Sequence, residues 1–94
     1  MRKNDTRKLA AFFNKKLDGK SLTELAPLFH MLSDLTRLRL LQALLTKGNH
    51  SVGDLVEELG IRQPVVSHHL SLLRLYGLVV NVKAGRNILY SVAE

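Results

Sequence analysis

Cysteine and tryptophan are absent from this 94-residue sequence, which also contains only two prolines. Without cysteine, the sequence excludes disulfides, thiol redox sensing and zinc–thiolate sites. No apolar run approaches the ~20 residues that a membrane-spanning helix requires. The basic start, residues 1–3, leads into polar residues rather than into the apolar segment of a signal peptide. We therefore expect a single-domain cytoplasmic protein without a membrane segment.

Positive charge is present in excess, and it is distributed unevenly along the chain. The net charge is +6; residues 1–20 contribute +5, residues 21–60 contribute −2 and residues 61–94 contribute +3. A basic domain is typical of a protein that binds a polyanion. A solvated surface with excess lysine would produce the same total, so charge alone leaves both interpretations open.

The N-terminal segment, residues 1–20, is predicted to form a basic arm and a dimerisation helix. Asn4 or Asp5 can cap a helix that runs to about Leu17. Two adjacent phenylalanines lie on this helix, and one helix face cannot easily bury both. The alternative is that both are ordinary core residues. The apolar residues that we predict to form the dimer interface are Leu9, Phe12, Phe13 and Leu17.

Two further helices are expected before the middle of the chain. Ser21 and Glu24 have the spacing of a capping box, and Pro27 predicts a kink or a late start in the helix that they open. Asp34 can cap the next helix, residues 35–46, in which leucines mark a broad buried stripe and Arg37 lies on another side.

Residues 51–76 have the pattern of a helix-turn-helix motif. Ser51 and Asp54 cap a short helix, residues 60–63 form a tight break, and Pro64 opens a second helix that stops at Gly77. At ~100° per residue, the second helix has an apolar side and a polar side. His69 falls on the apolar side, where we expect a core histidine hydrogen-bonded to the backbone, whereas His68 points outward.

A basic hairpin is expected after this motif. Residues 78–82 and 87–92 are rich in β-branched and aliphatic residues, and residues 83–86 between them form the predicted tip. Lys83 and Arg86 at this tip could reach phosphates or the minor groove. A charged turn that only keeps the hairpin soluble is a common alternative, but the position directly after a helix-turn-helix favours a DNA-binding wing.

Several segments, taken together and in order, resemble the ArsR/SmtB family of bacterial winged-helix repressors. They are residues 33–41, 51–55, 63–70, 73–74 and 77–79, followed by Gly85-Arg86 and Tyr90 in the hairpin. The resemblance implies a mostly α fold with a β-hairpin wing, the winged helix-turn-helix, covering residues 21–94. It also implies a homodimer on a partly palindromic operator in double-stranded DNA, released when an effector binds.

The sequence also departs from the family pattern. Leu35 stands where members usually have proline. Leucine is harmless in a first helical turn. Ser51 and Gly53 occupy the positions at which common metal-sensing members carry cysteines. The sequence ends at Glu94, directly after the wing, so we expect no C-terminal family helix. The N-terminal helix would then form the dimer interface alone.

We therefore predict a homodimeric, sequence-specific transcriptional repressor that is not an enzyme and uses no metal or cofactor; its effector stays open. The four histidines do not have metal-ligand spacing. The main alternative is a winged-helix module that binds proteins without sequence-specific DNA binding. RNA binding is disfavoured because the sequence offers no exposed aromatic platform. The predicted DNA-binding residues are Arg62, Gln63, Pro64, Ser67, His68, Ser71, Arg74, Lys83 and Arg86.

Overall fold

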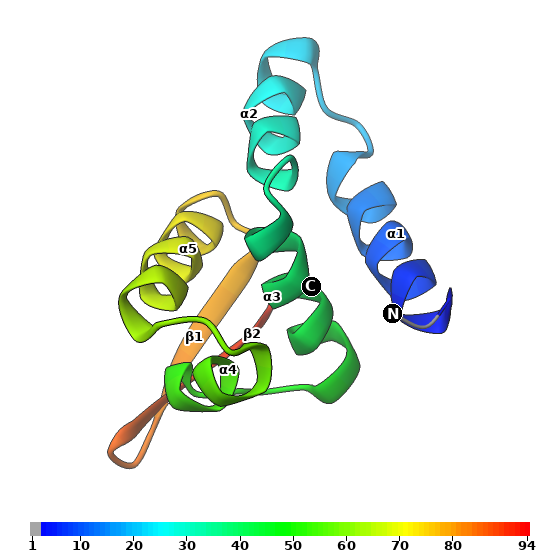
Figure 1. Cartoon of the computed structure of the whole chain (residues 1–94). Coiled ribbons are helices and arrows are strands. Elements are labelled where there is room, and N and C mark those ends of the chain that lie inside the picture. Colours follow the sequence, from blue (N-terminus) through cyan, green and yellow to red (C-terminus); the bar gives the residue numbers. More distant parts are fainter. Residues whose placement is uncertain (1–2) are drawn as a thin grey trace.

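The computed structural model describes the backbone of residues 3–94 and the side chains from Thr6 onward. Within this range, five helices are followed by a two-stranded antiparallel sheet (Figure 1). Residues 1–2 of the predicted basic arm lie outside the described residues. The elements are α1 (Lys3–Leu17), α2 (Leu22–Leu32), α3 (Leu35–Lys47), α4 (Val52–Leu59), α5 (Gln63–Leu75), β1 (Val79–Ala84) and β2 (Asn87–Val92).

Helix α1 starts earlier than the sequence predicted, whereas α2 starts where the capping box predicted. Helix α1 already includes Lys3, so neither Asn4 nor Asp5 stands at its N-cap. Helix α2 begins at Leu22 directly after Ser21, whose backbone N–H donates to the Glu24 carboxylate at 3.2 Å. Pro27 therefore does not delay the start of α2, because the cap fixes the first turn before the missing proline N–H is needed.

Helix α3 is at the centre of the core. Its N-cap is Asp34, whose carboxylate accepts the Arg37 backbone N–H at 3.0 Å, as the sequence predicted. Leu40, Leu41 and Leu44 of α3 are almost fully buried. Figure 1 shows α1 on one side of α3 and α5 with the hairpin on the other. The buried hydrophobic residues outside α3 are Leu9, Met31, Leu55, Val66, Leu70, Leu73, Leu78 and Val79.

Helices α4 and α5 form the predicted helix-turn-helix. Ser51 caps α4 by accepting the Asp54 backbone N–H at 3.1 Å, and its own N–H donates to the Asp54 carboxylate at 3.0 Å. Gly60 ends α4 in the left-handed conformation, with φ +66°, which an L side chain rarely adopts. Helix α5 starts at Gln63, one residue before the predicted start, with Pro64 in its first turn.

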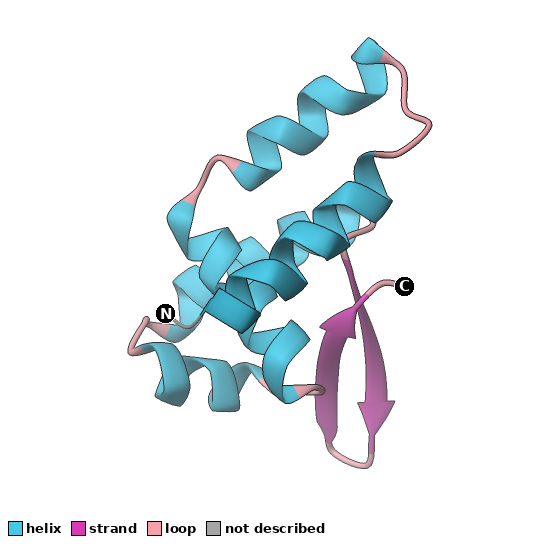
Figure 2. Ribbon diagram, turned by 90° about the vertical axis from the view of Figure 1, so that its right-hand side faces the viewer, coloured by secondary structure: helices cyan, strands magenta, loops and turns pink. Residues whose placement is uncertain are grey.

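The hairpin after α5 stands beside the helices, and its tip projects beyond them (Figure 2). Its tip is shorter than predicted: β1 continues to Ala84, so Lys83 lies within the strand, opposite Ile88. Only Gly85 and Arg86 separate the strands. Gly85 has φ +64°, as glycine does at the first central position of a two-residue hairpin turn. The longer tip was wrong because a two-residue turn allows pairing up to Ala84.

Candidate DNA-contacting surface

The outward side of α5 carries polar side chains that form no hydrogen bond or ion pair with any other side chain that the structure describes. Gln63, His68 and Ser71 are exposed, and Ser67 is half-buried. Among the described side chains, none of these four forms a hydrogen bond or an ion pair. Gln63, Ser67 and Ser71 follow one another at intervals of four residues, so they lie on one face of the helix. Their amide and hydroxyl groups are free to meet an external hydrogen-bonding partner.

Four cations flank this polar face. Arg62 is the N-cap of α5, Arg74 lies in its last turn, and Lys83 and Arg86 lie in the hairpin. All four are exposed, and within residues 6–94 none is paired with a carboxylate. Pro64, also exposed, occupies the first turn of α5, where its missing N–H costs nothing. The predicted DNA-binding residues thus all lie on α5, its cap or the hairpin.

The two cations of the hairpin, Lys83 and Arg86, lie at different places in it. Side chains alternate along a strand, so Lys83 shares a sheet face with Asn81 and the buried Val79. This face is directed toward the helices, and Lys83 extends it past the core to the hairpin end. Arg86 lies in the turn itself. The hairpin therefore presents one cation on its helix-side face and one at its end.

A buried arginine supports α5 from behind, which the sequence analysis did not predict. Arg37 is only 8% exposed, although it was expected on a side of α3 away from the core. Its Nε donates to the Met31 carbonyl at 2.8 Å, and its Nη1 lies 3.2 Å from Nδ1 of His69 on α5. His69 is half-buried, but its partner is this side chain rather than the predicted backbone group.

The electrostatic surroundings of His69 favour its neutral form. Burial lowers the pKa of His69 below its ordinary value. The carboxylate of Asp34 opposes this shift, whereas the positive charges of Arg37 and His68 reinforce it. A neutral imidazole has one nitrogen free to accept, which matches the donors of the guanidinium.

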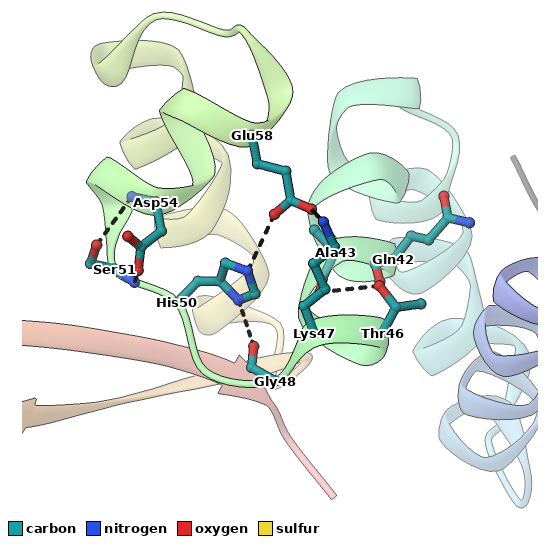
Figure 3. A network of polar contacts seen from close by, with 9 residues as sticks. All are labelled: Gln42, Ala43, Thr46, Lys47, Gly48, His50, Ser51, Asp54 and Glu58. Carbon is teal, nitrogen blue, oxygen red and sulfur yellow. Dashed lines mark hydrogen bonds and ion pairs between the residues drawn. The ribbon is translucent and has the colours of Figure 1, made fainter.

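A second polar junction supports the hairpin (Figure 3). His50, 8% exposed, pairs with Tyr90 of β2 through two backbone hydrogen bonds of 3.0 and 2.7 Å. Its ring lies between two acceptors: Nδ1 is 2.7 Å from the Gly48 carbonyl, and Nε2 is 3.2 Å from Oε2 of Glu58. Glu58 also forms an ion pair with Lys47. Glu58 makes both contacts while it remains an exposed residue of α4.

The residues predicted to form a dimer interface differ in how much of each side chain is exposed to solvent. Leu9 is 9% exposed and belongs to the core of its own chain. Phe12, Phe13 and Leu17 are half-buried, and the two phenylalanine rings lie 5.8 Å apart. A groove beside α1 is lined by Lys8, Ala11, Phe12, Lys15, Lys16, Leu45, Val92, Ala93 and Glu94.

Helix α2 adds exposed apolar surface that the sequence analysis did not single out. Leu22 is 85% exposed and Phe29 is 56% exposed, and the seven-residue interval puts both on one face. Within α2 only Met31 is fully buried. Helix α2 consists mostly of apolar residues. One of its faces stays uncovered because α2 projects from the end of α3 with little of the chain beside it (Figure 1).

The described part of the chain contains neither a group of metal ligands nor a helix that could span a membrane. Among residues 6–94, no three His, Asp or Glu side chains are placed to hold a metal ion. Within residues 3–94, none of the helices has the length and apolarity needed to span a bilayer.

Known proteins resemble this chain in both sequence and structure. The family model described as bacterial regulatory protein, arsR family, matches residues 34–80. The regulator NmtR of Mycobacterium tuberculosis is 41% identical over 78 residues, which are 83% of this chain and 64% of NmtR. The chain thus spans less than two thirds of that relative, and 63% of the biofilm growth-associated repressor of Agrobacterium fabrum, which is 40% identical.

Solved structures extend this likeness to the fold. The transcriptional repressor BigR from Xylella fastidiosa superposes with a TM-score of 0.70 at 38% identity, covering 77% of this chain and 70% of BigR. The cadmium metal-sensor CMTR from Mycobacterium tuberculosis superposes with a TM-score of 0.65 at 46% identity, covering 74% and 71%. Five helices and a hairpin in this arrangement therefore form a winged helix.

Proposed function

Because this chain belongs to the ArsR family of bacterial regulatory proteins, we propose that it is a sequence-specific transcriptional regulator that binds double-stranded DNA. The observation that carries the proposal is the outward face of α5. Amide and hydroxyl groups line it, and cations stand at both of its ends and in the hairpin; within residues 6–94 none of these groups is paired. An α-helix fits the major groove of DNA, where such groups reach base edges and phosphates.

Two kinds of contact divide the surface. Gln63, Ser67 and His68 read base edges, because amide, hydroxyl and imidazole groups exchange hydrogen bonds with the base pattern of the major groove. The remaining residues contact the phosphate backbone of the DNA. They position the protein there and read no base sequence directly. These positioning residues are Arg62, Ser71 and Arg74 on α5 and its cap, with Pro64 fixing the first turn and Lys83 and Arg86 on flanking DNA.

The regulator acts as a homodimer on a partly palindromic operator. Phe12, Phe13 and Leu17 of α1 keep apolar surface, and Leu22 and Phe29 of α2 extend it. Because Leu9 is buried in its own core, it contributes little to the contact with the second subunit. A stable protein interface buries at least about 1,000 Å² in total, which one short helix face does not supply easily.

The mode of action is repression in the cytoplasm. Relatives are described as repressors, including BigR and a probable mercury resistance operon repressor of Streptomyces lividans. Ser51 and Gly53 provide no thiolate, so regulation does not use a cysteine metal site at these positions. No enzymatic step, metal or cofactor is part of the proposal.

The test is selection of bound duplexes from a pool of random sequences, with the purified full chain. We expect enrichment of two related half-sites about one helical turn, roughly 10 bp, apart. Binding to the selected duplex should weaken steeply between about 50 and about 200 mM salt. Failure to enrich any sequence, together with binding that salt does not change, would contradict DNA recognition and favour a protein-docking module.

A separate test addresses the dimer. Sedimentation at several concentrations should show a dimer for the unmodified chain and a shift toward monomer for Phe29→Ser. Val82→Ser is the matched control, because Val82 is also 56% exposed but lies on the hairpin. A monomer at all concentrations, or equal effects of the two substitutions, would contradict the proposed interface.

A further inference from the structure

The guanidinium of Arg37 joins three elements of the fold at one buried point. Arg37 lies in the first turn of α3, and its Nε donates to the Met31 carbonyl at 2.8 Å. Its Nη2 lies 3.4 Å from the His30 carbonyl. Both carbonyls belong to the last turn of α2; the His30 carbonyl also accepts the Ser33 backbone N–H at 3.2 Å and the Ser33 hydroxyl at 2.7 Å. Arg37 therefore satisfies the end of α2 while it anchors the start of α3.

The third contact of the guanidinium reaches the middle of α5. Nη1 of Arg37 lies 3.2 Å from Nδ1 of His69, 32 residues away in the sequence. A guanidinium has only donors, so Nδ1 must accept. The ring is then neutral and carries its single proton on Nε2. The contact thus defines both the charge and the tautomer of His69.

Protonation of His69 would convert this contact from attraction to repulsion. A proton on Nδ1 would face the guanidinium N–H directly, and two cations would meet in a partly buried place. The charged and titratable groups that face His69 are Arg37 and Asp34 from α3 and its cap, and His68 from α5. The Asp34 carboxylate accepts the Arg37 backbone N–H at 3.0 Å, and among the described side chains it forms no hydrogen bond or ion pair with His69.

Helix α5 is the element that would move. Two carbonyls of α2 continue to hold Arg37 after the contact with His69 is lost. His69 is adjacent to His68, and the two ring centroids are 5.4 Å apart. Any displacement of His69 therefore reaches the outward side chain beside it. The polar face of α5 depends on a support that works only with a neutral imidazole.

We propose that Arg37 and His69 are positioning residues for DNA recognition, and that acidification weakens operator binding by breaking their contact. This inference rests on the proposed function. Neither residue touches DNA: Arg37 is buried, and His69 acts through the placement of α5. Acid release at this point is distinct from effector binding and from any metal.

The first experiment reads the tautomer without DNA. Nitrogen-15 NMR of the imidazoles in the intact chain at pH 7.5 should show His69 with a bare Nδ1 and a protonated Nε2. A protonated Nδ1 would overturn the proposal. This measurement stands even if no duplex is bound, so its failure and that of the proposed function are distinguishable.

The second experiment compares binding of the selected duplex between pH 7.5 and 5.5. His69→Asn places an amide oxygen near the position of Nδ1 and cannot be protonated there, whereas His69→Leu removes the acceptor. At pH 7.5 we expect Asn to bind within about threefold of the unmodified chain and Leu to bind about tenfold more weakly, the size of one hydrogen bond to a charged group.

The deciding measurement is how the DNA affinity of the unmodified chain and of His69→Asn changes with pH. The affinity of the unmodified chain should fall by about tenfold more than that of His69→Asn on acidification, because one charge-assisted contact is lost in the former only. His30, His50 and His68 are present in both proteins, so their contributions cancel in the comparison. Circular dichroism establishes that each variant is folded. Superimposable pH profiles of the unmodified chain and the Asn variant would overturn the proposal.

Discussion

His50 and Glu58 face each other at the base of the hairpin, with Nε2 of the ring 3.2 Å from Oε2 of the carboxylate. The other ring nitrogen lies 2.7 Å from the Gly48 carbonyl. Both nitrogens therefore face acceptors, and both contacts are satisfied together only when each nitrogen carries a proton. The backbone of His50 pairs with Tyr90, so this ring links β2 to α4.

The first prediction concerns this link. Glu58→Ala should lower the free energy of unfolding by about 1–2 kcal/mol, because it leaves a buried ring nitrogen without its charged acceptor. Urea denaturation would measure the change. Glu57→Ala is the matched control, since Glu57 is exposed and is not paired among the described residues. Equal losses for the two variants would show that the His50 contact does not stabilise the fold.

The second prediction concerns the cations near α5. Arg74→Ala should weaken binding to all duplexes alike and flatten the dependence of log affinity on log salt by about one unit. Fluorescence anisotropy titrations at several salt concentrations would provide the slope. Arg7→Ala removes the same charge from exposed α1, on the far side of α3, and should leave the slope unchanged. A flattened slope in the Arg7 variant alone would move the proposed interface to α1.

The third prediction concerns base recognition. Gln63→Ala should cost about 1–3 kcal/mol at one base pair of the selected duplex and relax the preference there. The affinities of duplexes that carry each of the four base pairs at every position would identify the one affected. The slope with salt should not change, because the amide contacts no phosphate. Uniform weakening on all sequences would instead make Gln63 a backbone contact.

The fourth prediction concerns the cap of α3. The hydrogen bond from the Arg37 backbone N–H holds the pKa of Asp34 below its ordinary value of 3.8. A carboxyl with a lowered pKa stabilises the folded state above the unfolded value and loses this effect as the pH falls through the folded value. Asp34→Ala should therefore cost about 1 kcal/mol at neutral pH.

That difference should shrink as the pH drops below 3.8, where the carboxyl of the unmodified chain becomes protonated. Thermal denaturation at neutral and acidic pH would test both statements. Asp18→Ala serves as the control, because Asp18 is exposed and follows α1 rather than opening a helix. A cost that stays constant with pH would show that the carboxylate charge plays no part in the cap.

Local signals explain why much of the fold could be predicted. Ser51 with Asp54 and the glycine at position 60 act through neighbours within four residues, so they define α4 from the sequence alone. The outward side of α5 follows from helical spacing, which is why Gln63, His68 and Arg74 were placed correctly on the surface.

Contacts between distant residues explain what was missed. An arginine in a leucine-rich helix is normally exposed, and only the α2 carbonyls and His69 make the burial of Arg37 favourable. His50 has no local pattern either, because its acceptors come from a loop and from α4. The end of β1 was misplaced because strand pairing, not residue type, decides where Lys83 lies.

The pairing of Lys83 with Ile88 limits how the hairpin can change in length. Side chains alternate between the two faces of a strand, so one residue inserted after Val79 would turn Lys83 away from the helices. The exposed Val82 would then replace it on the helix side. Relatives with longer or shorter hairpins should therefore differ by even numbers of residues in each strand, or should carry a bulge that restores the phase.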